Sequence, residues 1–278
     1  MHELSKIALG TVQFGLDYGI ANQSGKPNYD EISDILGFSL KTGITTLDTA
    51  SAYGDSEKVL GEYGVSSFNV ITKFLPKDQN LSLEESLQNS LVNLNSESVY
   101  GFLAHRPEAL DVIAWSKMND LKADGKVKKI GYSLQSVAEF EIVMDKGFIP
   151  DLVQVPFNLF DHRFKEICID LKNRDVEVHT RSTFLQGLFF LKENQFNDHF
   201  MNVKQLILDL QNKYQDTLAQ ILLNYALQQD FIDKVIIGVQ SKNQLIQNIS
   251  FLKKSSNIEE IHDLISEDVL NPALWPKN

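Results

Sequence analysis

The sequence predicts an α/β protein of the (β/α)8 class, a TIM barrel, with a single domain over residues 1–278. Eight short β-rich runs alternate with longer helical segments, over a length that such barrels commonly use for one domain. The runs are mostly apolar rather than alternating, as expected for parallel strands that are covered on both faces. No segment rich in Pro, Gly or Ser divides the chain, which favours one domain over two.

The elements follow one another in a regular order. The predicted strands span residues 6–11, 45–50, 69–73, 99–105, 128–133, 151–158, 176–182 and 234–239. Capped helix starts are predicted where Ser or Thr is followed three residues later by Glu or Gln: Ser82 with Glu85, Thr217 with Gln220, and Ser241 with Gln244. The link between the last two strands is long and predicts two helices, over 203–216 and 217–229. Eight strands separated by helices fit a closed barrel better than an open sheet.

Composition and charge exclude several classes of protein. The net charge is −11 and the charges are scattered, which argues against nucleic-acid binding. No run of about 18 apolar residues is present, so no membrane span is expected. The first residues lack the apolar stretch of a signal peptide, and Cys168 is the only cysteine, so a cytoplasmic location is expected. Cys168 is predicted to pack in a helix, and the dispersed histidines predict no metal site.

Polar side chains end several of the apolar runs. They are Asp48, Lys73, His105, Ser133 and Asn158, each at the end of a different predicted strand. Each one alone is typical of a strand-terminal or capping residue. In a barrel, however, the carboxyl ends of all strands meet at the face where active sites lie, so the set predicts a site.

Four residues of this region suit proton donation to a carbonyl group. Asp48 and Lys73 end neighbouring strands, so they are expected to pair, which satisfies the buried carboxylate. Tyr53, on the following loop, would lie near the ammonium, which is expected to lower the pKa of the phenol. His105 would hydrogen-bond a substrate oxygen. Since no side chain supplies hydride, a nicotinamide or flavin would be needed.

The chain resembles the aldo-keto reductase family. The resemblance rests on "GTVQFG" (10–15), "GITTLDTASAYGDSEKVLG" (43–61), "ITKF" (71–74), "FLAHRP" (102–107), "QVPFNLFDHR" (154–163), "RSTFLQGLF" (181–189) and "GVQSKNQLIQNI" (238–249), in order along nearly the whole chain. It implies a barrel that binds NADP(H), or less often NAD(H), and reduces aldehydes or ketones to alcohols. The implied catalytic set is Asp48, Tyr53, Lys73 and His105, with Tyr53 as the general acid.

The nicotinamide end of the implied cofactor site is only partly matched. The resemblance assigns Ser133 and Gln154 to the carboxamide, but Leu134 stands where the family usually has Asn and cannot hydrogen-bond. Arg181 occupies the position of a stacking Tyr, and an ion pair with a neighbouring carboxylate is the alternative for it. A phosphate loop is implied in which backbone N–H groups face the pyrophosphate, at Ser182, Leu185 and Gly187.

The adenosine end departs further from the family pattern. Relative to Asn248, the usual Arg and Lys positions hold Gln244 and Gly238, and Gln247 replaces a common Glu. Lys242 is expected either to reach a phosphate or to be a solvated residue at a helix start. With two cations missing, NADP(H) is placed ahead of NAD(H) on family habit alone.

The expected partner is a small carbonyl compound, in a protein that is a monomer or a weak homo-oligomer. Leu16, Tyr18 and Trp275 are candidate walls of the substrate site, while Arg106 is either a substrate contact or a rim charge. Trp275 alternatively packs against an outer helix. The opening segment resembles bacterial relatives linked to sugar metabolism, which makes a keto sugar or a nucleotide-activated keto sugar a candidate substrate. Two alternatives remain: a nicotinamide-binding redox-sensing subunit with little turnover, and a lyase or isomerase that uses Lys73.

Overall fold

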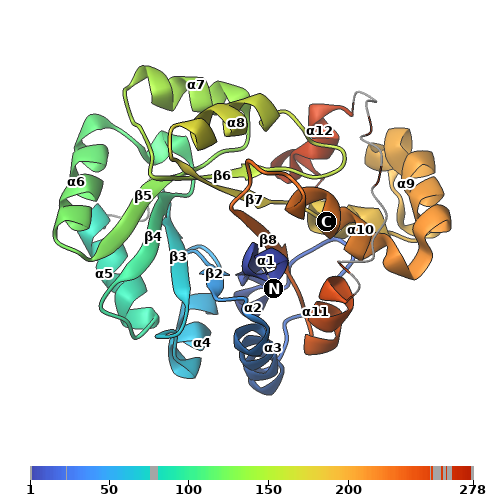
Figure 1. Ribbon diagram of the computed structural model, residues 1–278, viewed down its shortest axis with the longest axis horizontal. Coiled ribbons are helices and arrows are strands. Elements are labelled where there is room, and N and C mark those ends of the chain that lie inside the picture. The colour runs from blue at the N-terminus through green and yellow to red at the C-terminus, as the bar shows by residue number, and fades with distance from the viewer. Residues whose placement is uncertain are drawn as a thin grey trace.

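Eight parallel strands close into a barrel in the computed structural model, in the order in which they occur along the chain (Figure 1). The structure describes residues 2–22, 24–75, 81–250, 252, 258, 261 and 265–276. The strands are β1 (Ile7–Gly10), β2 (Thr46–Asp48), β3 (Asn69–Phe74), β4 (Val99–Ala104), β5 (Val127–Ser133), β6 (Leu152–Pro156), β7 (Glu177–Arg181) and β8 (Lys234–Gly238). All eight coincide with predicted runs, and the predicted fold class is confirmed.

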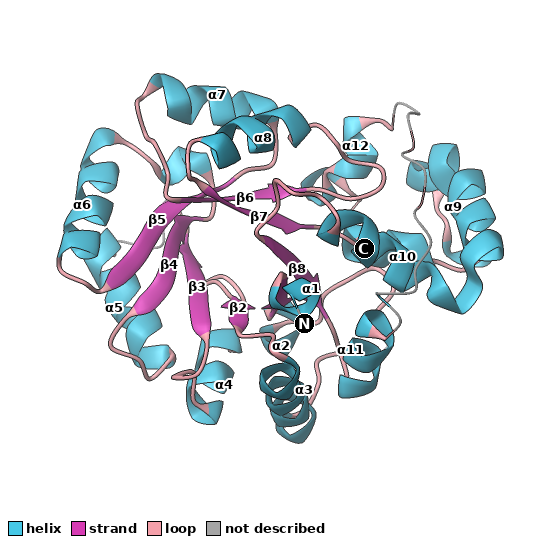
Figure 2. Cartoon of the chain, in the orientation of Figure 1, coloured by secondary structure: helices cyan, strands magenta, loops and turns pink. Residues whose placement is uncertain are grey.

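Helices surround the barrel on its outside (Figure 2). They are α1 (His2–Ser5), α2 (Val12–Gly15), α3 (Tyr29–Thr42), α4 (Ser56–Tyr63), α5 (Leu83–Asn93), α6 (Val112–Ala123), α7 (Val137–Asp145), α8 (Lys165–Asn173), α9 (Met201–Tyr214), α10 (Leu218–Leu227), α11 (Lys242–Ile249) and α12 (Glu267–Leu270). The long link before β8 carries α9 and α10, as predicted. No helix of the described residues has the length and apolar character that crossing a membrane requires.

The helix starts show how local side chains satisfy free backbone N–H groups. The capping box of Ser82 at α5 is confirmed in both directions. At α11 only half is present, since the Ser241 hydroxyl accepts from the backbone but Gln244 Oε1 accepts from Gln240 N–H instead. The box predicted at Thr217 is wrong, because its hydroxyl donates to the Tyr214 carbonyl at 2.6 Å and caps nothing.

One capping box was not predicted. At α7, Ser136 accepts from the backbone of Glu139, and the Glu139 carboxylate accepts from the Ser136 N–H in return. This helix follows β5 directly, so the box fixes the chain where it leaves the strand. The helix therefore begins close to the carboxyl end of the barrel.

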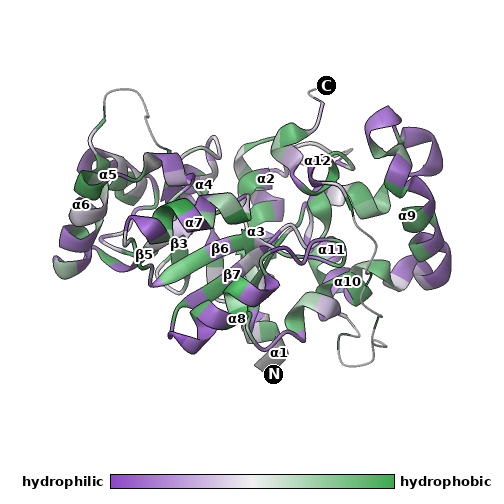
Figure 3. Ribbon diagram, turned by 90° about the horizontal axis from the view of Figure 1, so that it is seen from above, coloured by the Kyte–Doolittle hydropathy of each residue, from purple (hydrophilic) through white to green (hydrophobic). Residues whose placement is uncertain are grey.

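The core is apolar, and the barrel interior is layered. Strand residues are mostly hydrophobic, whereas outward helical faces such as that of α9 carry hydrophilic residues (Figure 3). Ile71, Leu103 and Leu152 form a buried cluster of their own. Side chains two residues apart on a strand point the same way, so Lys73 and Gln154 lie one layer above this cluster. The interior below the carboxyl ends is thus packed, with apolar side chains on β3, β4 and β6 and a polar pair on β7, where the buried His179 ring lies 2.6 Å from Glu177.

Cys168 behaves as a packing residue. It lies on the buried face of α8 and is fully shielded from solvent. Burial raises the pKa of its thiol to about 12, so the thiolate is not formed near neutral pH. The predicted packing of Cys168 is confirmed.

Candidate active site

Asp48 and Lys73 form a buried ion pair at the carboxyl end of the barrel. Lys73 Nζ lies 2.8 Å from both carboxylate oxygens of Asp48 and also donates to the Thr49 carbonyl at 2.8 Å. Gln154 reaches across from β6 and donates from Nε2 to Asp48 Oδ1 at 2.8 Å. Burial lowers the pKa of Lys73, while Asp48 acts in the opposite direction. The predicted pairing of Asp48 with Lys73 is confirmed, and Gln154 is an additional partner.

Tyr53 lies beside this pair on the loop after β2. Lys73 Nζ is 5.1 Å from the centroid of the Tyr53 ring, and the His105 ring meets it edge-on with centroids 5.7 Å apart. Burial and then Asp48 raise the pKa of the Tyr53 phenol, while Arg181 and Arg106 act to lower it. This direction is the opposite of the one expected from the nearby lysine, because loss of solvent outweighs the neighbouring cations.

Close backbone packing holds the Tyr53 loop in place. A Cβ at Gly15 would lie 1.7 Å from the Tyr53 carbonyl oxygen, and one at Gly54 would lie 2.6 Å from the Gly15 carbonyl oxygen. Gly54 also has a φ of 57°, which favours glycine. The Ser56 hydroxyl donates to the Thr11 carbonyl at 2.9 Å. The glycines of "GTVQFG" and "AYG" therefore allow α2 and this loop to touch.

His105 is held as a neutral imidazole. Its backbone N–H donates to the Phe74 carbonyl at 2.8 Å, which continues the barrel pairing past the end of β4. Burial, followed by the charges of Lys73, Arg106 and Arg181, lowers the pKa of His105 to about 3. Its Nδ1 is buried and lacks a hydrogen-bond partner among the described residues. A neutral imidazole has one N–H donor, which suits hydrogen bonding to an uncharged oxygen.

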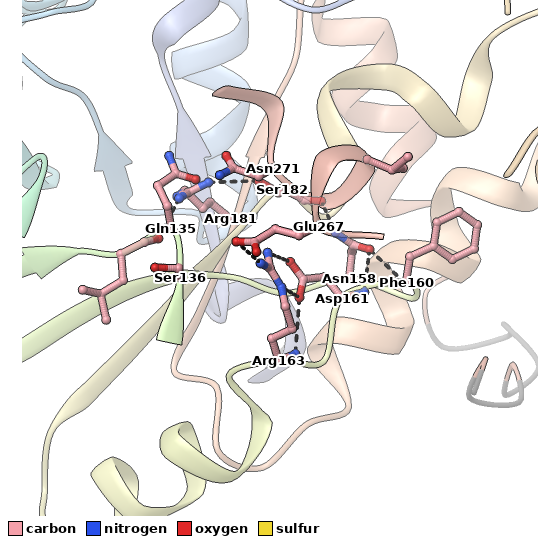
Figure 4. Close-up of polar contacts among 12 residues, drawn as sticks. Gln135, Ser136, Asn158, Phe160, Asp161, Arg163, Arg181, Ser182, Glu267 and Asn271 are labelled. Atoms are coloured by element: carbon pink, nitrogen blue, oxygen red, sulfur yellow. Dashed lines mark hydrogen bonds and ion pairs between the residues drawn. The ribbon is translucent and has the colours of Figure 1, made fainter. Parts of the chain in front are cut away.

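Arg181 ends β7 next to the same site (Figure 4). Its Nη2 donates to the Leu134 carbonyl at 2.7 Å and its Nη1 to the Ser182 hydroxyl at 3.2 Å. Both acceptors are uncharged, a carbonyl and a hydroxyl. The structure therefore does not show the alternative for Arg181, an ion pair with a carboxylate. The Leu134 side chain packs in the core, and its carbonyl is the group that serves the site.

The nearest loop carboxylate to Arg181 is engaged elsewhere. Asp161 accepts from Arg163 at 2.9 Å and 2.8 Å through both of its oxygens. Arg163 also binds Glu267 of α12 at 3.1 Å, so the C-terminal segment is attached to the loop after β6 (Figure 4). Asn158 donates to the Ser182 carbonyl at 3.0 Å, which links the ends of β6 and β7.

A cleft opens at this end of the barrel, with about 1010 Å³ of empty volume including solvent at its mouth. Of the residues predicted for the site, those that line it are Asp48, Tyr53, Gln154, Arg181, Ser182, Gly187, Gly238 and Gln244. Tyr18 is a wall of the cleft as expected, but Leu16 and Trp275 are not among its lining residues. Trp275 instead packs edge-on against Phe200 at 4.9 Å and donates to the Val269 carbonyl at 2.9 Å. Its role is therefore packing near α9.

The loop after β7 corrects one expectation. Ser182 and Leu185 have φ values of 66° and 45°, so the chain turns tightly here. The Leu185 N–H donates to the Ser182 carbonyl at 2.8 Å, and the Gly187 N–H to the Phe184 carbonyl at 2.9 Å. Because these bonds close the turn, the N–H groups of Leu185 and Gly187 are engaged within the loop, which differs from the expectation for these two residues. Ser182 lines the cleft, and a phosphate contact there stays a prediction. The Leu185 side chain is fully buried in the core.

The residues predicted for the adenosine end lie in different surroundings. Lys242 Nζ lies 3.3 Å from Asp34 of α3 and outside the lining of the cleft, so its charge is already paired. Gln244 is exposed and lines the cleft, and Gln247 is exposed on α11. Asn248 is buried, and its Nδ2 lacks a hydrogen-bond partner among the described residues. Ser133, predicted for the nicotinamide end, is buried at the end of β5.

Among the cleft residues that the sequence analysis did not predict, two carry unpaired polar atoms. Gln13 Oε1 and Thr183 Oγ1 are buried atoms without a hydrogen-bond partner among the described residues, and both side chains line the cleft. Gln13 lies against Gly238, where a Cβ would come within 2.4 Å of its Nε2. Unpaired polar atoms in a cleft are the kind that a bound ligand satisfies. The position of Gln13 within "GTVQFG" could have indicated it, whereas Thr183 carried no signal.

The described part of the chain holds no cluster of three or more His, Cys, Asp or Glu side chains that is arranged to bind a metal ion. The four predicted catalytic residues instead form one ion pair, one phenol and one neutral imidazole. That combination suits proton transfer to an oxygen atom.

Comparison with known proteins gives relatives of one kind. An aldo-keto reductase of Bacillus subtilis, YhdN, is 22% identical over 317 residues, which cover 99% of this chain and 94% of that protein. The methylglyoxal reductase DkgA of Escherichia coli is 26% identical over 230 residues, covering 80% of this chain and 78% of its own. The holo structure of an aldo-keto reductase from Bacillus halodurans superimposes with a TM-score of 0.73 at 17% identity, covering 91% of this chain and 88% of that one.

A family model also matches most of the chain. The model described as "Aldo/keto reductase family" matches residues 6–266, from the residue before β1 to the residue before α12. The match includes every strand of the barrel and every side chain of the site described above. This chain is therefore a member of the aldo/keto reductase family.

Proposed function

We propose that this protein reduces an aldehyde or ketone to an alcohol with a nicotinamide cofactor, and that Tyr53 is the general acid. The observation that supports this most directly is the convergence of three side chains beside the cleft. Lys73 Nζ lies 5.1 Å from the centroid of the Tyr53 ring, and the centroid of the His105 ring lies 5.7 Å from that same point. The family to which the chain belongs consists of oxidoreductases that act on carbonyl groups.

The residues around the cleft fit a nicotinamide cofactor. Within the described part of the chain, Gln13 Oε1 and Thr183 Oγ1 are unpaired acceptors in the cleft, and Asn248 Nδ2 is an unpaired buried donor on α11, outside the cleft lining. Ser133 and Gln154 would bind the carboxamide, and the reduced cofactor supplies the hydride when bound. One N–H of Gln154 is already given to Asp48, so its carbonyl oxygen and second N–H remain for a ligand.

The chain's own residues then divide the remaining work. Tyr53 holds its proton at neutral pH, because burial raises the pKa of the phenol, and it gives that proton to the carbonyl oxygen as the carbonyl carbon is reduced. Lys73 lies next to the ring and stabilises the tyrosinate that forms, while Asp48 fixes the ammonium. Neutral His105 hydrogen-bonds the same carbonyl oxygen and orients it.

For the cofactor, NADP(H) is proposed ahead of NAD(H) on the habit of the family. The strand-eight side supports only weak selectivity between the two. Lys242 is paired with Asp34, and Gln244 is uncharged, so neither offers a free cation to a 2′-phosphate.

The test is a fluorescence titration of the purified protein with NADPH and with NADH, followed by turnover of glyoxal and methylglyoxal. Methylglyoxal is the substrate in the name of the Escherichia coli relative, and a Bacillus subtilis relative is named a glyoxal reductase. Tyr53→Phe should keep the cofactor Kd within about twofold and lose at least about 100-fold in kcat, the usual contribution of a general acid.

The outcomes separate the alternatives. Unchanged turnover in Tyr53→Phe would remove Tyr53 from its assigned role. Tight cofactor binding with negligible turnover of every carbonyl tried would favour a redox-sensing subunit. Trapping of Lys73 by borohydride in the presence of substrate would favour a lyase or isomerase, although a lysine engaged by Asp48 and Thr49 is poorly placed for it.

A further inference from the structure

Arg106 is a cation that the mechanism above does not use. It follows His105 directly, with an extended backbone that begins the short turn over Pro107–Ala109. Its Nη1 is buried and lacks a hydrogen-bond partner among the described residues. A buried guanidinium nitrogen without an acceptor is costly to leave unpaired, so a missing partner is the simplest account of it.

The charge of Arg106 acts at the reacting end of the site. This charge acts to lower the pKa of the His105 imidazole and of the phenols of Tyr53 and Tyr18. Both tyrosines line the cleft. Arg106 and Arg181 also repel each other. The charges of two guanidinium groups therefore act on the region in which a substrate would meet Tyr53: Arg181 lines the cleft, while Arg106 follows His105 outside the lining, with its Nη1 buried.

The carboxylates of this region are already committed. Asp48 is bound by Lys73 and Gln154, and Asp161 is bound through both oxygens by Arg163 (Figure 4). His105 is neutral, so it neither adds nor removes charge. The opposite charges of Asp48 and Lys73 cancel each other, as do those of Asp161 and Arg163. A third buried carboxylate, Glu57, accepts hydrogen bonds from Thr72 and Asn93. Among the described residues, Arg106 and Arg181 have no ion pair with a carboxylate.

We propose that the site takes an anionic carbonyl compound, with a carboxylate or phosphate group near the aldehyde or ketone, and that Arg106 binds that anion. The inference rests on the proposed reductase function and names its substrate class. A guanidinium stays charged at every relevant pH and presents parallel N–H donors, which match the two oxygens of a carboxylate or phosphate. Arg181, which spends two N–H groups on Leu134 and Ser182, adds to the positive field.

The test uses two aromatic aldehydes, 4-formylbenzoate and its methyl ester, of which only the first is charged; the ratio of variant to wild-type kcat/KM for each compound cancels their different intrinsic reactivities. Both are assayed with the wild-type protein, with Arg106→Gln, and with Arg174→Gln as a matched control. Arg174 is exposed at the end of α8 and paired with Asp170, away from the cleft. Glyceraldehyde and glyceraldehyde 3-phosphate form a second pair, which separates a phosphate preference from a carboxylate preference.

The wild-type protein should prefer the anion of at least one pair. Arg106→Gln should lower kcat/KM for that anion by about 10- to 100-fold, the value of a charge-assisted hydrogen bond, mainly through KM. The neutral partner should change by less than about twofold, and Arg174→Gln should change neither. Equal kcat/KM for both members of both pairs in the wild type would overturn the proposal. An equal loss for anion and neutral compound in Arg106→Gln would reduce Arg106 to a structural role.

A binding measurement keeps this inference separate from the proposed function. Benzoate and benzamide have the same size and differ in charge, and neither is reduced. Calorimetry with the protein saturated with oxidised cofactor should show tighter binding of benzoate, lost in Arg106→Gln. Tighter benzoate binding without turnover of any aldehyde would contradict the reductase while retaining the anion site. Turnover of neutral aldehydes with no preference for benzoate would support the reductase and contradict the anion site.

Discussion

The contact between Gly15 and the Tyr53 loop gives a sharp test of how the site is positioned. In Gly15→Ala, the new Cβ would lie 1.7 Å from the Tyr53 carbonyl oxygen and 2.7 Å from the Ser56 nitrogen. Both atoms belong to the backbone, so neither can rotate away. An ordinary contact requires the two segments to separate by about 1.5 Å.

The expected effect follows from that displacement. Overpacking of this kind costs about 1–3 kcal/mol, which a domain with typical stability survives. Movement of a catalytic group by about 1 Å costs on the order of 100-fold in rate, so turnover should fall far more than stability does. The assay is kcat with glyoxal or methylglyoxal, measured beside the midpoint of urea unfolding.

Gly37→Ala is the matched control. Gly37 lies inside α3, and a Cβ there would meet only the Tyr63 hydroxyl at 3.6 Å. The same chemical change should leave turnover unaltered and stabilise the helix by about 0.5–1 kcal/mol. Wild-type turnover in Gly15→Ala would refute the view that this backbone contact positions Tyr53.

Two further predictions concern stability. His105 has a pKa of about 3 in the folded state against 6.5 as its ordinary value, so the unfolded chain takes up this proton first and stability is lost as the pH falls below 6.5. His105 should contribute about 2 kcal/mol to the loss between pH 7 and pH 5, and a urea series should show a smaller loss in His105→Gln; an identical loss would mean that His105 is not held neutral. Ser82→Ala removes the capping box of α5 and should cost about 1 kcal/mol in thermal or urea unfolding, whereas the same change at exposed Ser116 inside α6 should cost nothing. Equal effects at the two serines would show that the cap contributes no stability.

Much of the fold could be predicted because its signals are local. Most strands are short apolar runs, several of which end at a polar residue, and the helix starts at Ser82 and Ser241 carry their own caps. The prediction at Thr217 was wrong because its hydroxyl donates to the Tyr214 carbonyl, an acceptor within the preceding turn. A capping pattern shows which hydrogen bonds a side chain can form, while the nearest free partner determines which of them forms.

The site could be predicted only as far as neighbouring strands determine it. The Asp48–Lys73 pair follows from adjacency in the barrel, but the bond from Gln154 to Asp48 joins residues 106 positions apart on opposite strands. No local pattern encodes such a contact. The direction of the pKa shift of Tyr53 was also out of reach, because it depends on burial rather than on the residues next to it.

Charge placement shows the same limit. Lys242 stands in a segment that resembles a phosphate-binding region, yet its ammonium lies beside Asp34, 208 residues earlier in the chain. Arg106 could be named from the sequence only as a substrate contact or a rim charge. Its unpaired nitrogen became visible once the surrounding carboxylates had been assigned to other partners.

The burial of the Asp48–Lys73 pair above the layer of Ile71, Leu103 and Leu152 has a consequence for substitutions at the pair. Lys73 has no exposed surface and Asp48 is 4% exposed, so water cannot replace a partner that is lost. Removal of one charge would leave the other buried and unpaired, at a cost of about 3–5 kcal/mol, whereas removal of both leaves no such charge. The two residues therefore act as one unit, and neither can be exchanged without the other.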